Sequence, residues 1–461
     1  MKYNKTYIFG ITLVATLGGL LFGYDTAVIS GAEKSIEAYL IRPLGLNSLI
    51  HGATVSSALI GCIIGGVISG VFSNRFGRRK TLLIAAVLFF VSALGSGFPE
   101  FIFFSKGHPS IGLLLTFNFY RIIGGVGVGL ASAVSPMYIS EIAPADIRGR
   151  LVSFNQFAII FGMLVVYFVN WGIAFGQSID WINDVGWRYM FASEAIPAAL
   201  FGMLLFLVPE TPRYLVLSNR DEKARSVLSR INADKLRAEA IFSEIKQSIG
   251  RTTERSRIFS YGKIVILMGI LLSVFQQFVG INVALYYAPR IFESMGAAKD
   301  ASMLQTIIMG FVNVVFTVVA ILTVDKWGRK PLLITGSIGM AIGMFAISWL
   351  SYNEIIGIST LVFIIIYTAS FMMSWGPICW VLISEIFPNK IRGQAVAVAV
   401  GAQWAANYLI SSTYPAMMEY SGALTYGFYG LMAVLSALFV WKMVPETKGK
   451  SLEEMESLWK E

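Results

Sequence analysis

Apolar runs of about 20 residues recur along almost the whole chain, with short polar stretches between them. A run of this length crosses the ~30 Å hydrocarbon core of a bilayer as one α-helix. A transmembrane β-barrel would instead show short segments of alternating polarity. The pattern therefore predicts an all-α membrane protein with about twelve spanning helices, near residues 8–28, 54–73, 81–98, 111–134, 151–175, 189–208, 264–286, 304–324, 331–350, 355–383, 394–415 and 425–444.

One long polar segment interrupts this pattern. Residues 211–263 are charged and helix-prone and contain no spanning run, so we expect them to form helices in water. The chain then divides into a six-helix half at 1–210, this linker, a second half at 264–445 and a tail at 446–461. The first apolar run contains Asp25 and has no small-residue cleavage site, so it is expected to stay as a helix rather than be removed as a signal peptide.

Composition excludes an ordinary soluble enzyme. Of the 461 residues 56% are hydrophobic and 14% are charged, whereas soluble domains carry roughly 25% charged residues. The net charge of +9 does not indicate nucleic acid, because the basic residues form short clusters between apolar runs. These clusters fall in alternate loops, and the positive-inside rule then predicts that both termini face the cytoplasm.

Few residues suggest metal, disulfide or nucleotide chemistry. Cys62 and Cys379 lie inside apolar runs, and His51 and His108 fall at span ends or loops, where we expect them to be solvated. The glycine-rich stretch 124–129 lies within a predicted membrane helix, so it favours close helix packing over dinucleotide binding. We expect no metal site and no cofactor beyond a proton as coupling ion.

The two halves repeat their polar motifs in the same order. Arg75-Phe-Gly-Arg-Arg-Lys80 matches Asp325-Lys-Trp-Gly-Arg-Lys330, Glu141-Ile-Ala-Pro-Ala-Asp-Ile-Arg-Gly149 matches Glu385-Ile-Phe-Pro-Asn-Lys-Ile-Arg-Gly393, and Pro209-Glu-Thr-Pro-Arg213 matches Pro445-Glu-Thr-Lys448. A duplication of six-helix halves is a transporter architecture with the substrate between the halves at mid-membrane.

The charged groups of these repeats are candidates for ion pairs on the cytoplasmic side. Such pairs could hold the halves together while the outer side is open, although interfacial anchoring would explain them too. The predicted latch residues are Arg75, Arg78, Arg79, Glu141, Arg148, Glu210, Asp325, Arg329, Glu385, Arg392 and Glu446.

A second set of charges lies inside the predicted bilayer. Asp25 sits in the first span, where a charge costs about 2.5–3.5 kcal/mol on insertion scales. Arg121, in the fourth span, is the obvious partner, and protonation of Asp25 would release it. Glu194, in the sixth span, is a second intramembrane acid that could tune this pair or serve as a structural hydrogen-bonding group.

Seven carboxamides lie in the predicted membrane helices. Each amide offers one acceptor and two donors, which suits sugar hydroxyls without the desolvation penalty of a charge. Trp380, Trp404 and Phe22 add aromatic surfaces that can pack on a sugar ring. Gly280 permits local unwinding beside the amides at 276–282. The seven amides are Gln156, Gln276, Gln277, Asn282, Asn313, Gln403 and Asn407.

These motifs resemble those of the sugar porter family of the major facilitator superfamily. The resemblance rests on Gly77-Arg-Arg79, Gly328-Arg-Lys330, Pro209-Glu-Thr-Pro-Arg213, Gln276-Gln-Phe-Val-Gly-Ile-Asn282 and Pro445-Glu-Thr-Lys-Gly449. Leu21-Phe-Gly-Tyr-Asp25 and Met373-Ser-Trp-Gly-Pro-Ile-Cys-Trp380 are similar to its bacterial proton-coupled xylose carriers. The similarity runs through all twelve predicted spans and is weakest in the outer loops and the central linker.

The resemblance implies import of a monosaccharide with a proton across the bacterial inner membrane, with D-xylose favoured, by a monomer that alternates its access. It implies Asp25 as the proton site and sugar contacts from Gln156, Gln276, Gln277, Asn282, Trp380 and Gln403, with Phe22, Asn313 and Tyr286 nearby. Met163 departs from the pattern, because the xylose carriers have Gln there and hexose facilitators tend to be apolar. A proton-coupled or passive hexose carrier therefore stays open, as do a sugar sensor and a drug exporter with less support.

Overall fold

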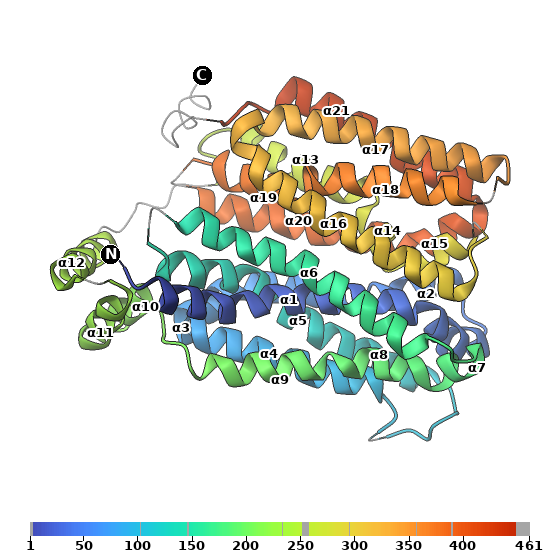
Figure 1. The fold of residues 1–461 in the computed structure, drawn as a ribbon, viewed down its shortest axis with the longest axis horizontal. Helices are drawn as coiled ribbons and strands as arrows, with labels where there is room; N and C mark the ends of the chain where they lie inside the picture. Colours follow the sequence, from blue (N-terminus) through green and yellow to red (C-terminus); the bar gives the residue numbers. More distant parts are fainter. Residues whose placement is uncertain are drawn as a thin grey trace.

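The structure is a computed structural model that describes residues 3–101, 103–144, 147–232, 234–250, 258–294, 296–355, 357–388 and 391–448. Its helices run along one common axis in two sets that lie side by side (Figure 1). We call α1 to α9 the first set and α13 to α21 the second set. The residue limits predicted for the two halves remain a prediction.

The first set begins with a helix that continues beyond the length of one bilayer crossing. Its elements are α1 (Lys5–Ile36), η1 (Glu37–Ile41), η2 (Arg42–Leu44), α2 (Ser48–Val55), α3 (Ser57–Phe76), α4 (Arg78–Gly97), α5 (Ile111–Ile142), α6 (Arg148–Ala174), α7 (Ile179–Trp181), η3 (Ile182–Gly186), α8 (Trp187–Ser193) and α9 (Ala195–Leu205).

The second set has a broken first span. Its elements are α13 (Lys263–Phe278), α14 (Ile281–Tyr286), α15 (Ala288–Ser294), α16 (Lys299–Trp327), α17 (Arg329–Tyr352), α18 (Ile358–Met372), α19 (Trp375–Glu385), α20 (Arg392–Tyr420) and α21 (Gly422–Met443). Between α13 and α14, Gly280 adopts the left-handed conformation with φ of +89°. The predicted unwinding at Gly280 is therefore confirmed.

Ten helical stretches of the described chain are long and apolar enough to cross a membrane. The other two predicted spans correspond to α8 with α9, which is interrupted at Glu194, and to α20, whose inner face is polar. Large apolar side chains are exposed on the outside of the bundle, such as Val67 at 71% and Leu207 at 78%. An exposed apolar surface of this extent is expected where lipid, not water, surrounds the helices.

Both ends of the helix bundle can be identified from Figure 1. The start of α1 and the end of α21 lie at one end, which we call the terminal end, and the loops after η1 and α15 lie at the far end. The predicted polar linker forms α10 (Pro212–Leu217), α11 (Asp221–Ile231) and α12 (Lys235–Gly250) at the terminal end.

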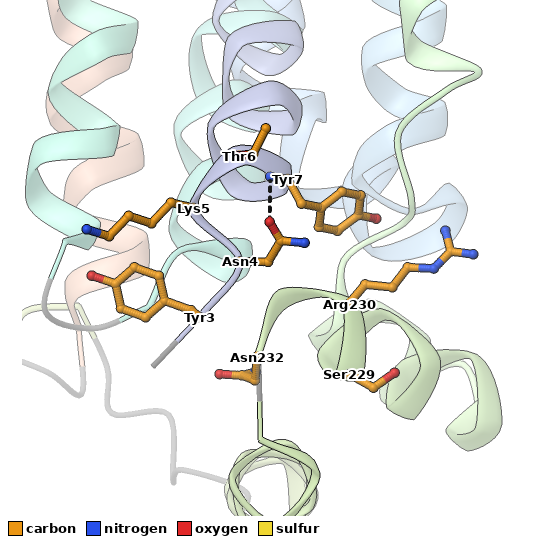
Figure 2. Close-up of a pocket in the computed structure, with 8 residues that line it drawn as sticks. All are labelled: Tyr3, Asn4, Lys5, Thr6, Tyr7, Ser229, Arg230 and Asn232. Atoms are coloured by element: carbon orange, nitrogen blue, oxygen red, sulfur yellow. Dashed lines mark hydrogen bonds between the residues drawn. The ribbon is translucent and has the colours of Figure 1, made fainter. Parts of the chain in front are cut away.

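The segment before α1 is attached to this linker. The backbone N–H of Asn4 donates to the carbonyl of Ile231 at 2.8 Å, and Tyr3 forms an antiparallel bridge with Asn232. An open cavity of about 720 Å³ lies beside this contact (Figure 2). The side chains of Lys5 and Arg230 point away from one another there, so the cavity offers no converging cations and we assign it no ligand.

Glycines let the helices of the first set approach closely. A Cβ atom on Gly125 of α5 would lie 1.8 Å from the carbonyl oxygen of Ala58 on α3, and one on Gly23 of α1 would lie 1.8 Å from that of Ile159 on α6. Only glycine fits such backbone contacts. The packing role predicted for the glycine-rich stretch 124–129 is therefore confirmed.

Candidate functional site

Asp25 and Arg121 form a buried ion pair between α1 and α5. The Arg121 Nη1 atom lies 2.7 Å from Asp25 Oδ1, and each side chain is 2% exposed. The Arg121 guanidinium also lies over the Phe191 ring, 5.2 Å from its centroid. The structure thus brings together the two charges that the sequence pairs, and their role in proton coupling remains a prediction.

Glu194 lies at the break between α8 and α9 and is buried. Its Oε1 atom has no hydrogen-bond partner among the described residues. The neighbouring Ser193 hydroxyl is 2.8 Å from the hydroxyl of Tyr24, the residue that precedes Asp25 on α1. This contact places the break between α8 and α9 against α1. Glu194 therefore lies close to the ion pair, and its role in tuning that pair remains a prediction.

Four of the predicted amides form a connected chain in the second set. Asn282 donates to the Gln277 oxygen at 2.5 Å, Gln277 donates to the Gln276 oxygen at 3.3 Å, and Gln403 donates to the same Gln276 oxygen. Gln276 itself donates to the carbonyl of Trp375 at 2.9 Å. The break at Gly280 and the long helix α20 therefore bring amides that are 127 residues apart into direct contact.

Aromatic and phenolic groups continue this cluster toward the first set. The ring centroids of Phe22 on α1 and Trp404 on α20 are 5.8 Å apart. Asn407, one turn further along α20, donates to the Tyr286 hydroxyl at 3.5 Å. Since Phe22 is three residues before Asp25, one turn of α1 connects the ion pair with the amide and tryptophan cluster.

Three buried polar atoms of the predicted sugar contacts have no hydrogen-bond partner among the described residues: Gln403 Oε1, Trp404 Nε1 and Asn313 Oδ1. A buried unpaired group costs about 1–3 kcal/mol, so atoms of this kind indicate a place where water or a ligand binds. Gln156 and Trp380 are partly exposed, and Met163 is buried on α6. Their contact with a sugar remains a prediction.

The repeated motifs at the terminal end build the same network in each set. Arg78 pairs with Glu141 at 2.8 Å, and Arg329 pairs with Glu385 at 3.1 Å. The Thr211 hydroxyl donates to Glu141, and that of Thr447 donates to Glu385, both at 2.6 Å. The internal duplication that the sequence predicts is therefore confirmed in three dimensions.

Glu210 and Glu446 complete these two networks. Glu210 accepts from the backbone N–H groups of Arg78 and Arg79, and Glu446 accepts from those of Arg329 and Lys330. Burial raises the pKa of Glu210. Burial also acts on Glu446, but its backbone N–H donors outweigh it and hold its pKa below the usual value.

The remaining latch candidates make other contacts. Arg392 donates to the carbonyl of Phe387 at 3.2 Å, Arg75 lies over the Phe76 ring, and Arg148 is exposed. The side chain of Asp325 and residues 449–461 lie outside the described residues. The ion pairs of Arg78 with Glu141 and of Arg329 with Glu385 each join residues of one set, so the predicted latch between the halves stays a prediction.

Sequence reasoning missed an ion-pair cluster at the far end. Arg290 of the second set lies 2.8 Å from Glu33 of the first and also pairs with Glu37, and Lys34 pairs with Glu293. The partners are separated by more than 250 residues, so no local pattern could pair them.

The expectation that His51 is solvated is wrong. Its side chain is 2% exposed and its Nε2 atom lies 3.2 Å from the carbonyl oxygen of Glu33. Burial lowers the pKa of His51, although the nearby Glu33 carboxylate opposes this. The packing of α2 on α20 and the contact of His51 with Glu33 of α1 bury the ring, and the tertiary fold rather than the local sequence sets this position. His108, in the loop before α5, is exposed as expected.

Comparison with known proteins places these features in a wider group. A family model described as "Sugar (and other) transporter" matches residues 11–459. The D-xylose-proton symporter of Escherichia coli strain K12 is 56% identical over 99% of this chain and 97% of its own.

Two solved structures are similar throughout. An inward-open structure of the Escherichia coli xylose transporter has a TM-score of 0.89 and 54% identity over 98% of this chain and 100% of its own. A proton:xylose symporter of the major facilitator superfamily bound to 6-bromo-6-deoxy-D-glucose has a TM-score of 0.82 and 54% identity over 99% of this chain and 100% of its own.

Proposed function

Because the chain belongs to the sugar transporter family and has the major facilitator fold, we propose that it imports D-xylose together with protons by alternating access. The observation that carries this proposal is the connection along α1 between the buried pair of Asp25 and Arg121 and the Phe22 contact with Trp404. A proton site and a sugar site joined by one helical turn can be coupled directly.

In this proposal Asp25 takes a proton from the outer side. The protonated carboxyl no longer attracts the Arg121 guanidinium, so the contact between α1 and α5 weakens. The sugar hydroxyls bind the unpaired oxygen of Gln403 and the other amides, and the Trp404 ring packs against the sugar ring. One charge that moves through ~100 mV supplies ~2.3 kcal/mol, which sustains roughly 40- to 50-fold accumulation of sugar.

We assign the terminal end to the cytoplasm and the far end to the outside. The basic loops of the sequence support this orientation through the positive-inside rule. The far-end ion pairs then close the outer side, and the TM-score of 0.89 to an inward-open relative supports this. The transporting unit is one chain, because both helix sets around the site belong to it.

A hexose carrier, proton-coupled or passive, is the second candidate. The apolar Met163 on α6 favours it, and so does the relative that holds a bromodeoxyglucose. A hexose carrier would have the same fold and the same site. It would differ from the first candidate in its preference for hexose over pentose, or in transporting sugar without a proton. Uptake measurements with both sugars therefore separate the two candidates.

The test is uptake into proteoliposomes with an imposed inward proton gradient, with xylose and glucose compared for the native protein and Asp25→Asn. We expect the native protein to concentrate xylose and the variant only to equilibrate it, because Asn carries no titratable proton. Sugar exchange at equal concentrations, which needs no net proton movement, is the control that the variant is folded.

Two other results would change the proposal. Equal equilibration by both proteins would indicate a facilitator in which Asp25 is structural. Accumulation of glucose without xylose would keep the coupling and assign a hexose substrate, with Met163 as the first position to exchange for Gln.

A further inference from the structure

Three potential metal ligands of the first set meet at the far end. Glu33 lies on α1, Glu37 in η1 and His51 on α2, and their ligand atoms all lie within 4.8 Å of one another. Zinc is commonly bound by imidazole nitrogen and carboxylate oxygen at about 2.0–2.2 Å. Side-chain rotations that bring these three groups closer together would place them at bonding distance of one ion.

One cation of the second set occupies this place in the present structure. The Arg290 Nε atom lies 2.8 Å from Glu33 Oε1, and its Nη2 atom pairs with Glu37. The Glu33 side chain is 1% exposed, yet its second oxygen, Oε2, has no hydrogen-bond partner among the described residues. That oxygen lies 3.5 Å from His51 Nε2, so a buried acceptor is left open toward the imidazole.

The three ligands belong to the first set, whereas Arg290 belongs to the second set. Glu33, Glu37 and His51 all lie on the continuous stretch of the first set from α1 to α2, so these groups stay near one another when the sets move. The bound ion would replace the proton on His51 Nε2 that now faces the Glu33 carbonyl. When the far end opens in alternating access, Arg290 leaves with the second set. The pair of Arg42 and Glu37 remains, but Glu33 then loses its ion pair with Arg290.

We propose that Glu33, Glu37 and His51 form a divalent-cation site that Zn²⁺ occupies when Arg290 withdraws, and that the bound ion holds the far end open. The ion and the guanidinium compete for the same carboxylate oxygens, so zinc binds the open state better than the closed state. A ligand that prefers one state shifts the population toward it. The imidazole disfavours Mg²⁺ and Ca²⁺, which take oxygen ligands.

The first test measures inhibition of sugar exchange by ZnCl₂ added at the far-end face of oriented vesicles. We expect inhibition of the native protein, and at least a tenfold higher half-inhibitory zinc concentration for His51→Ala. His108→Ala is the matched control, because the only other histidine lies exposed at the same end of the molecule. Equal zinc sensitivity of the native protein and His51→Ala would overturn the site.

The second test measures zinc binding directly by calorimetry on the purified protein. We expect Arg290→Gln to bind Zn²⁺ at least tenfold more tightly than the native protein, since the competing guanidinium is gone, and MgCl₂ to give no binding. Unchanged or weaker binding would show that Arg290 does not compete. This measurement needs no sugar, so it fails or succeeds independently of the proposed substrate.

Discussion

Gln403 ends the amide chain with an acceptor that the described residues leave open. Its amide nitrogen donates to Gln276, whereas its buried oxygen has no hydrogen-bond partner. The Gln276 amide is already held by backbone carbonyls of α19. Gln403 is therefore the member of this amide chain that we predict to bind a sugar hydroxyl.

Removal of this acceptor tests the sugar site at the scale of one residue. Gln403→Ala deletes the open oxygen and also leaves the Gln276 oxygen without one of its two amide donors, so we expect xylose to bind about 10- to 150-fold more weakly, from roughly 1.4–3 kcal/mol. Calorimetric titration of xylose measures this. Asn353→Ala is the control, because that amide lies exposed at the end of α17, where it donates to the Trp349 carbonyl. Equal affinity in native protein and Gln403→Ala would remove Gln403 from the site.

The sequence predicts an ion pair between two single residues only where burial of one charge requires a countercharge. A charge at Asp25 within an apolar span requires a countercharge, and Arg121 is the nearest cation inside a span, so physics alone predicts the pair. Glu33 and His51 lie at the ends of spans, where water could equally solvate them. Their burial depends on contacts with α15 and α20, which no local spacing encodes.

At the scale of elements, two of the five glycines of α1 lie in opposite environments. Gly23 packs directly on the carbonyl of Ile159 on α6, whereas nothing lies within 4 Å of a Cβ atom built on Gly10. The close approach at Gly23 positions both Phe22 and Asp25. The contact of α1 with α6 thus determines where the proton site and the aromatic contact lie.

We therefore expect Gly23→Ala to abolish most transport and to lower the melting temperature, because a backbone oxygen 1.8 Å away cannot be avoided without separating the helices. Gly10→Ala lies in the same helix and should keep native transport with equal or slightly higher stability, as alanine favours helices by up to about 1 kcal/mol over glycine. Thermal-shift and uptake assays measure both. Native activity of Gly23→Ala would mean that α1 and α6 are not rigidly positioned.

The breaks in spanning helices differ in how far the sequence predicts them. Gly280 adopts a positive φ that other residues rarely tolerate, so its place among clustered amides predicts a break. The interruption at Glu194 is less visible. Pro197 lacks the N–H that would bond to the Ser193 carbonyl, yet Pro136 lies inside the unbroken α5. A proline alone therefore does not determine where a helix breaks. The break at Glu194 depends on the packing of α8 and α9 against α1.

At the scale of the whole molecule, ion pairs differ between the two ends. The terminal-end networks join residues within one set, and the far-end pairs of Arg290 and of Lys34 join one set to the other. The duplicated motifs made the first kind predictable. The second kind depends on the relative position of the sets, which one sequence does not encode in any local pattern.

Charge exchange across the far end tests whether these pairs set the equilibrium between states. Lys34→Glu should shift the population toward a far-end-open state by about 1.4- to fivefold, since a partly exposed pair contributes about 0.2–1 kcal/mol. Lys34→Glu combined with Glu293→Lys should restore the native population. Distances between spin labels on the two sets at the far end measure this. A double variant as open as the single one would show that the pair does not hold the closed state.

The bridge between Tyr3 and Asn232 attaches the linker helices to the segment that precedes α1. Through this bridge, and through the contacts of α11 with α1 and of α10 with α5, the linker is fastened to the first set (Figure 2). A fluorophore on the exposed face of α11 would therefore move with the first set, and a second fluorophore at the end of α21 would move with the second set. Energy transfer between the two would report how the sets rotate against each other. The same attachment that anchors a short N-terminal segment makes the protein a ready scaffold for an optical sensor of its own transport cycle.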